Sequence, residues 1–161
     1  PNLDEEIIER GLAKARLPGR FEIIEKLPGY QGLPAVILDG AHTLNSVKLT
    51  IDTFNKLYGE KKVNLLFACA ADKDVEDIAK IFKYRFEHIY ITRPGEKKES
   101  NLEKEIQAFK DAELKFTADP DFKKMIKTAF EDSAKNASLL LITGSFYLIA
   151  EAKSFIDKLS E

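Results

Sequence analysis

The chain lacks several features that define whole classes of protein. It has a single cysteine, Cys69, so no internal disulfide can form, which fits a reducing compartment such as the cytoplasm. No apolar run approaches the roughly 18–20 residues that span a bilayer. The formal net charge of −2 gives no general attraction to nucleic acid or to an anionic membrane. We therefore expect neither as a partner.

The usual phosphate-binding and metal-binding motifs are also missing. There is no GxxxxGK(S/T) segment to cradle a triphosphate, and no GxGxxG dinucleotide fingerprint. With one cysteine and two well-separated histidines, His42 and His88, a zinc site is not expected. The chain begins with an acidic, amphipathic segment that differs from a secretory signal, and it has no initiator methionine. These features favour a processed chain or an excised fragment.

What the sequence does contain is typical of one α/β domain. Its 161 residues suit a single core, and 44% hydrophobic with 32% charged residues is an ordinary globular balance. Short apolar runs alternate with segments of helical periodicity, which predicts a mostly parallel sheet covered by helices. We expect a Rossmann-like three-layer domain with about six strands, at residues 21–25, 35–39, 63–69, 88–92, 114–117 and 138–143.

Apolar stripes with a spacing near 3.6 predict the helices between these strands. Helix starts are expected at Asp74, at the capping-box pattern that begins with Ser100, and at Asp119-Pro120. Residues 1–19 are interpreted as an amphipathic linker helix and turn, and residues 20–161 as the domain. The stripes are Val47, Ile51, Phe54 and Tyr58; Val75, Ile78, Ala79 and Phe82; Phe122, Met125, Ile126, Ala129 and Phe130; and Leu148, Ala152, Phe155 and Leu159.

The most informative segment is VILDGAHTLN, at residues 36–45. It reads as a buried strand that ends in a carboxylate, Asp39, followed by a glycine turn and an imidazole, His42, at the start of a helix. In open α/β sheets, ligands bind just beyond the carboxyl ends of the strands. Asp39 and His42 are therefore candidates for contact with a ligand.

Four short motifs in a fixed order carry a family resemblance: PGRFE at residues 18–22, DGAH at 39–42, ADKD at 71–74 and GSF at 144–146. In these motifs the chain resembles the C-terminal domain of folylpolyglutamate synthase/dihydrofolate synthase enzymes, within the Mur ligase superfamily. The resemblance implies an ATP-dependent amide ligase. Such an enzyme adds L-glutamate to a folate or dihydropteroate carboxylate through an acyl phosphate. ATP and Mg²⁺ would be held mainly by an N-terminal P-loop ATPase domain of the same polypeptide, which lies outside this chain.

The resemblance also suggests residue roles, each with a structural alternative. Arg20, Asp39, His42 and Lys73 would contact the nucleotide, with no catalytic residue and no metal ligand assigned to this domain. Arg20 and Lys73 are otherwise solvated cations, Asp39 a turn residue and His42 a packing residue.

A second group of residues would lie near the incoming glutamate. Gly144, Ser145 and Phe146 end the last strand and open the last helix, where backbone N–H groups and a hydroxyl can meet a carboxylate. Ser145 is equally suited to cap that helix. In this interpretation the chain supplies half of an active site, on one wall of an interdomain cleft.

Two departures from the family pattern and three other functions stay open. Thr43-Leu44 follow DGAH where the family usually has Asn-Pro, and a turn-rich insertion at residues 28–34 lengthens the segment between Arg20 and Asp39. If the insertion lifts Arg20 away from the cleft, its assignment fails. The alternatives are a free-standing nucleotide- or anion-binding module, a structural interaction domain, or another Mur-type ligase domain for peptidoglycan precursors.

Overall fold

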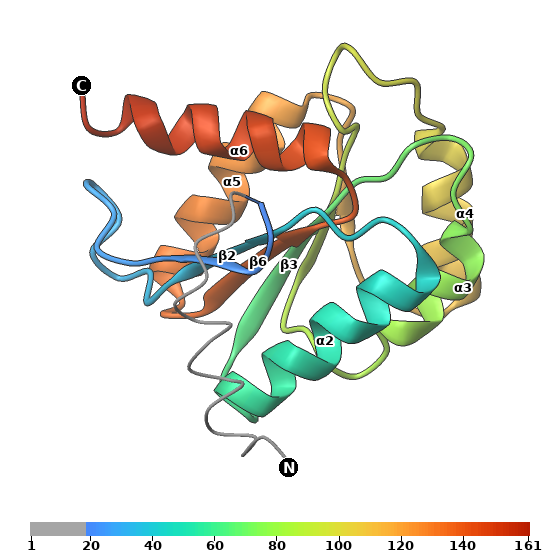
Figure 1. The fold of residues 1–161 in the computed structure, drawn as a ribbon, viewed down its shortest axis with the longest axis horizontal. Coiled ribbons are helices and arrows are strands. Elements are labelled where there is room, and N and C mark those ends of the chain that lie inside the picture. The colour runs from blue at the N-terminus through green and yellow to red at the C-terminus, as the bar shows by residue number, and fades with distance from the viewer. Residues whose placement is uncertain (1–18) are drawn as a thin grey trace, which may run out of the picture.

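A computed structural model describes residues 19–161, and the predicted helix within residues 1–18 lies outside them. The described part contains one six-stranded sheet in the order β1-β2-β6-β3-β4-β5 (Figure 1). All neighbouring strands are parallel except β1 and β2, which are antiparallel. The strands are β1 (Glu22–Ile24), β2 (Val36–Asp39), β3 (Val63–Phe67), β4 (Ile89–Ile91), β5 (Thr117–Ala118) and β6 (Leu139–Thr143).

Five helices cover both faces of the sheet, so the predicted three-layer α/β fold is confirmed (Figure 1). One face packs against α2 (Leu44–Tyr58), α3 (Val75–Ile81) and α4 (Leu102–Asp111). The other face packs against α5 (Phe122–Lys135) and α6 (Phe146–Lys158). No helix in residues 19–161 is long and apolar enough to cross a membrane.

Alternation along the strands divides the core between these two faces. In β6, Leu139 and Leu141 face α2, α3 and α4, whereas Leu140 and Ile142 face α5 and α6. All four are at most 4% exposed. Fully burying one such side chain contributes about 1.5–3 kcal/mol, so the central strands anchor both layers.

The predicted fifth strand is displaced from residues 114–117 to Thr117–Ala118. The reason is the turn that ends α4. Glu113 adopts a left-handed conformation with φ of 60°, and the Leu114 amide donates to the Phe109 carbonyl at 3.0 Å. Leu114 therefore belongs to the helix terminus, and the strand begins only after the chain has left it.

The structure confirms only some of the predicted helix starts and capping residues. Helix α3 begins at Val75 as expected, but the Asp74 side chain makes no capping hydrogen bond. Helix α4 begins one residue later than predicted, because the Asn101 side chain, not Ser100, accepts from the Lys104 amide. Ser145 does cap α6, accepting a hydrogen bond from the Tyr147 amide at 3.1 Å.

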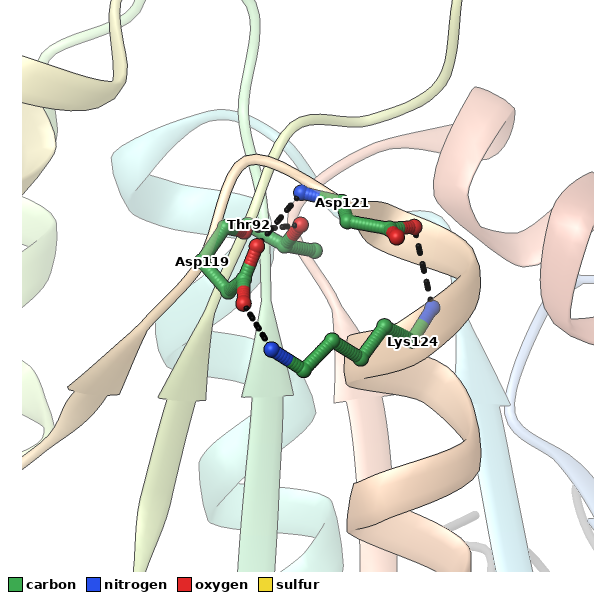
Figure 2. A network of polar contacts seen from close by, with 4 residues as sticks. All are labelled: Thr92, Asp119, Asp121 and Lys124. Atoms are coloured by element: carbon green, nitrogen blue, oxygen red, sulfur yellow. Dashed lines mark hydrogen bonds and ion pairs between the residues drawn. The ribbon is translucent and has the colours of Figure 1, made fainter.

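The predicted start of α5 at Asp119-Pro120 is wrong by two residues, and Figure 2 shows why. The Asp119 carboxylate accepts from the Asp121 amide and from Lys124 Nζ, both at 2.8 Å. The Asp119 carbonyl accepts from Thr92 Oγ1 at 2.7 Å. Asp121 is then the residue whose side chain accepts from the Lys124 amide and caps the helix.

The insertion at residues 28–34 connects the antiparallel strands β1 and β2 as a hairpin. It packs onto the α5 and α6 side of the core, where Leu27 and Leu33 are buried and Tyr30 contacts the rings of Phe130 and Phe155. Because the hairpin joins the end of β1 to the start of β2, it lies at the opposite end of these strands from Arg20 and Asp39. The insertion therefore does not separate the two residues.

Candidate functional site

Two adjoining hollows lie at the carboxyl edge of the sheet. The first has a volume of about 370 Å³ and is lined by Arg20, Asp39, His42 and Phe146, among others. The second, of about 200 Å³, adjoins it, because His42 and Phe146 line both. The remaining residues of the second hollow are Ala70, Lys73, Lys98, Gly144, Ser145 and Tyr147.

Asp39 is fixed at the end of β2 by two backbone amides. Its Oδ2 accepts from the Phe21 amide at 3.0 Å, and its Oδ1 accepts from the Ala41 amide at 2.8 Å. Burial raises the pKa of this carboxyl above its ordinary value, and the two amide hydrogen bonds act against that rise. Asp39 therefore holds the turn that follows β2 and the turn that precedes β1. Each oxygen still has a lone pair for a ligand, since a carboxylate offers about four acceptor positions.

Arg20 sits in a turn whose two flanking residues, Gly19 and Phe21, are hydrogen-bonded to the end of β2. The Gly40 amide donates to the Gly19 carbonyl at 2.7 Å, and the Phe21 amide donates to Asp39. The Arg20 side chain is exposed, and its guanidinium lies 5.5 Å from the centroid of the Phe146 ring. At that distance the ring attracts the cation and holds it beside the first hollow.

His42 has one ring nitrogen bonded to the protein and the other available. Nδ1 lies 2.9 Å from the Gly40 carbonyl, so it carries the proton in this arrangement, and the neutral ring presents Nε2 as an acceptor. The imidazole also contacts Phe146 edge to face, with the ring centroids 5.9 Å apart. His42 thus has a packing contact and, at the same time, a position on the wall between the two hollows.

Two glycines allow this arrangement. A Cβ on Gly40 would lie 2.2 Å from the Phe146 ring, so only a glycine lets that ring approach the end of β2. Gly144 has φ of +110°, and a Cβ there would lie 2.1 Å from the Ala68 carbonyl oxygen. A side chain at either position would therefore collide, at Gly40 with the Phe146 ring and at Gly144 with the backbone of Ala68.

All seven predicted site residues lie at this edge, but in two groups. Arg20, Asp39 and His42 line the first hollow. Lys73, which was grouped with them, lines the second hollow with the three residues assigned to glutamate, Gly144, Ser145 and Phe146, of which Phe146 lines the first hollow as well. The sequence reasoning missed Leu49 in the first hollow, and Lys98 and Tyr147 in the second. Leu49 is 67% exposed on α2, outside the buried stripe used to predict that helix.

A parallel α/β sheet with ligand-sized hollows at its carboxyl edge defines a ligand-binding domain of the Rossmann-like class. Residues 19–146 match the family described as Mur ligase, glutamate ligase domain. The chain belongs to this family, and the resemblance seen in the four motifs is confirmed.

Three similar proteins illustrate the relationship. The chain is 26% identical over 153 residues to the dihydrofolate synthase/folylpolyglutamate synthase of Bacillus subtilis, covering 94% of this chain and 33% of that protein. It superposes with a TM-score of 0.75 and 24% identity on the folylpolyglutamate synthase of Thermotoga maritima, covering 98% and 34% of the two chains. The E. coli FolC structure with DHPP and ADP gives 0.72 at 21% identity, covering 100% and 36%. The chain spans about a third of the length of these relatives.

Proposed function

We propose that this chain is the glutamate-ligase half of an ATP-dependent enzyme that joins L-glutamate to a folate or dihydropteroate carboxylate through an acyl phosphate. The observation that carries the proposal is the convergence of Arg20, Asp39 and His42 on one hollow that adjoins a second, cation-lined hollow. A nucleotide and an amino acid would then meet at the His42–Phe146 wall. The names of the Bacillus subtilis and E. coli relatives support this choice of substrates.

The first hollow suits part of a nucleotide. The free lone pairs of Asp39 can accept from ribose hydroxyls, and the exposed Arg20 guanidinium can hold phosphate oxygens in bidentate fashion. The hydrogen bond to Gly40 uses Nδ1 of His42, so a protonated ring would have Nε2 left to donate to a phosphate. These three residues would bind and orient the nucleotide on this side of the cleft.

Mg²⁺ does not fit the described residues alone. Across residues 19–161, no three His, Cys, Asp or Glu side chains cluster as metal ligands. In the proposal, the P-loop ATPase domain that precedes this chain in the same polypeptide holds the Mg²⁺ and most of the triphosphate. Residues 1–19 would form the linker to it. Closure of the cleft would exclude water from the acyl phosphate and orient the attacking amine.

The test compares this chain alone with the same chain joined to its ATPase domain. We expect ADP release that depends on both L-glutamate and dihydropteroate or folate from the joined protein, and none above the no-enzyme control from the chain alone. Catalysis by the isolated chain would contradict the need for a second domain. A joined protein without glutamate-dependent turnover would contradict the proposed reaction.

Two variants of the joined protein then test the site. Asp39→Asn and His42→Ala should each lower kcat/KM for ATP by about 10- to 100-fold, the cost of losing a hydrogen bond to a charged group. Asp52→Asn, an exposed carboxylate on α2, is the matched control and should leave turnover unchanged. Normal ATP dependence in both site variants would remove Asp39 and His42 from the nucleotide site.

A further inference from the structure

Lys98 reaches the second hollow from the loop between β4 and α4, and contacts hold this loop on two sides. The Ala71 amide, in the loop after β3, donates to the Glu99 carbonyl at 3.2 Å. On the other side, a Cβ on Gly95 would lie 3.5 Å from Cγ of Glu151, so the loop rests against α6. The Lys98 ammonium lies 5.9 Å from the centroid of the Tyr147 ring, within range of a cation–π contact.

The second hollow is a positive environment without a carboxylate in its lining. Lys73 and Lys98 both line it, together with the first turn of α6, whose N–H groups and dipole favour an anion. Within residues 19–161, the nearest carboxylate to Lys73 Nζ is Asp72 at 3.9 Å, which is 74% exposed, and no ion pair forms at Lys98. Two ammonium groups facing one small hollow repel each other, and an anionic ligand relieves that repulsion.

The size and orientation of the hollow select the kind of anion. Its volume of about 200 Å³ is below the ~300–1,000 Å³ of pockets for drug-sized ligands, and suits one amino acid. An attacking amine must face the His42–Phe146 wall that the first hollow shares. Ser145, Lys98 and Tyr147 all line the second hollow and not the first. With the amine at the wall, the α-carboxylate would lie beside Ser145 and the side chain would extend towards Lys98 and Tyr147.

We propose that Lys98 determines amino-acid specificity by binding the side-chain carboxylate of the incoming glutamate. This inference rests on the proposed function for the identity of the amino acid. It adds a residue that the sequence motifs do not contain, and it explains why a second cation is needed beside Lys73. A dicarboxylic amino acid would satisfy both ends of the hollow, whereas glutamine would leave the ammonium of Lys98 without its anion.

The experiment is an NMR titration of the 161-residue chain with L-glutamate and, separately, with L-glutamine. L-glutamate should shift the amides of Ser145, Phe146 and Tyr147. Lys98→Gln should weaken glutamate binding by about 10- to 100-fold and abolish the preference for glutamate over glutamine, because a charge-assisted hydrogen bond is lost. Lys98→Arg keeps the charge and should retain the preference. The matched control is Lys97→Gln, an exposed neighbour that does not line the hollow.

The outcomes separate this inference from the proposed ligase activity. Absence of glutamate-dependent shifts at Ser145–Tyr147, or equal selectivity in wild type and Lys98→Gln, would overturn the role of Lys98. Selective glutamate binding that is lost in Lys98→Gln but kept in Lys97→Gln would support it, even if the joined protein failed in the ATP-dependent assay.

Discussion

Glu105 should make the stability of this domain depend on pH, and replacing it by glutamine should remove that dependence. The side chain lies in the first turn of α4 and is only 1% exposed. Its Oε1 accepts from the Cys69 amide at 3.1 Å, whereas its Oε2 is buried with no hydrogen-bond partner in residues 19–161. Burial raises the pKa of Glu105 from 4.5 to about 8, and the hydrogen bond with Cys69 only partly opposes this.

The sign and size follow from the two protonation states. The unfolded chain releases the Glu105 proton near pH 4.5, whereas the folded chain keeps it until about pH 8. Between these values the unfolded state binds fewer protons, so the free energy of unfolding falls as pH rises, by about 1.4 kcal/mol per pH unit. The stability that the protonated Glu105 side chain contributes is fully present below pH 4.5 and is lost above pH 8. At pH 7 the loss amounts to about 3 kcal/mol, a large part of the stability of an ordinary domain.

Glu105→Gln is the informative substitution, because glutamine has the shape of the protonated carboxyl and no proton to lose. We expect the variant to match the wild type at acid pH and to exceed it by about 3 kcal/mol at pH 7. Urea unfolding followed by far-UV circular dichroism suits a chain without tryptophan. Glu103→Gln, an exposed carboxyl on the same helix, is the matched control. Parallel pH profiles for the wild type and Glu105→Gln would refute the reasoning.

Two further predictions concern the carboxyl edge. Gly144→Ala should destabilise the fold by about 2–4 kcal/mol in urea unfolding, because the new Cβ meets the Ala68 backbone oxygen at 2.1 Å. The control Gly29→Ala, with φ of +79° but open space around it, should destabilise the fold clearly less. Equal losses of stability would show that the contact with Ala68 does not matter. Phe146→Ala should change the free energy of unfolding by about 1 kcal/mol or less, because Phe146 is 40% exposed. The same substitution should weaken nucleotide binding by the joined protein, measured by calorimetry. An unchanged affinity for the nucleotide would show that the ring does not organise Arg20 and His42.

Much of the fold was predictable, because the spacing of apolar residues along the sequence matches the residues that each helix and strand buries. The apolar stripe Phe122, Met125, Ile126, Ala129 and Phe130 is buried on one face of α5, and the continuous apolar run at residues 139–142 lies in the central strand β6. Such patterns survive small errors in the element boundaries. The start of α5 did not follow from the sequence, since Asp119 and Asp121 are both suitable caps. The tertiary contact of Asp119 with Thr92 on β4's carboxyl side, together with its bond to Lys124, decides between them.

The candidate site was predictable where its residues lie at or just after the ends of strands. Asp39 ends β2, His42 and Ser145 follow β2 and β6 within three residues, and the carboxyl ends of parallel strands meet at one edge. Lys98 lies seven residues beyond β4, in a loop that Gly95 places against α6 and Glu99 ties to the loop after β3. No local pattern encodes this position, because the partners of these two contacts, Glu151 and Ala71, are far from Lys98 in sequence. A charged residue in a long loop is therefore the kind of site residue that sequence reasoning misses.

Arg20 shows how the one antiparallel strand completes the site. Had β1 run parallel to β2, the residue before it would lie at the amino end of the sheet, far from Asp39. In the antiparallel register Glu22 pairs with Leu38, so the chain before β1 meets the carboxyl end of β2. The ion pair between Glu22 and Lys153 of α6, at 3.2 Å, then fixes this edge strand to the helix layer. Reversal of one edge strand thus brings a cation to the carboxyl edge of the sheet, while the insertion at residues 28–34 lies at the opposite end of the same strands.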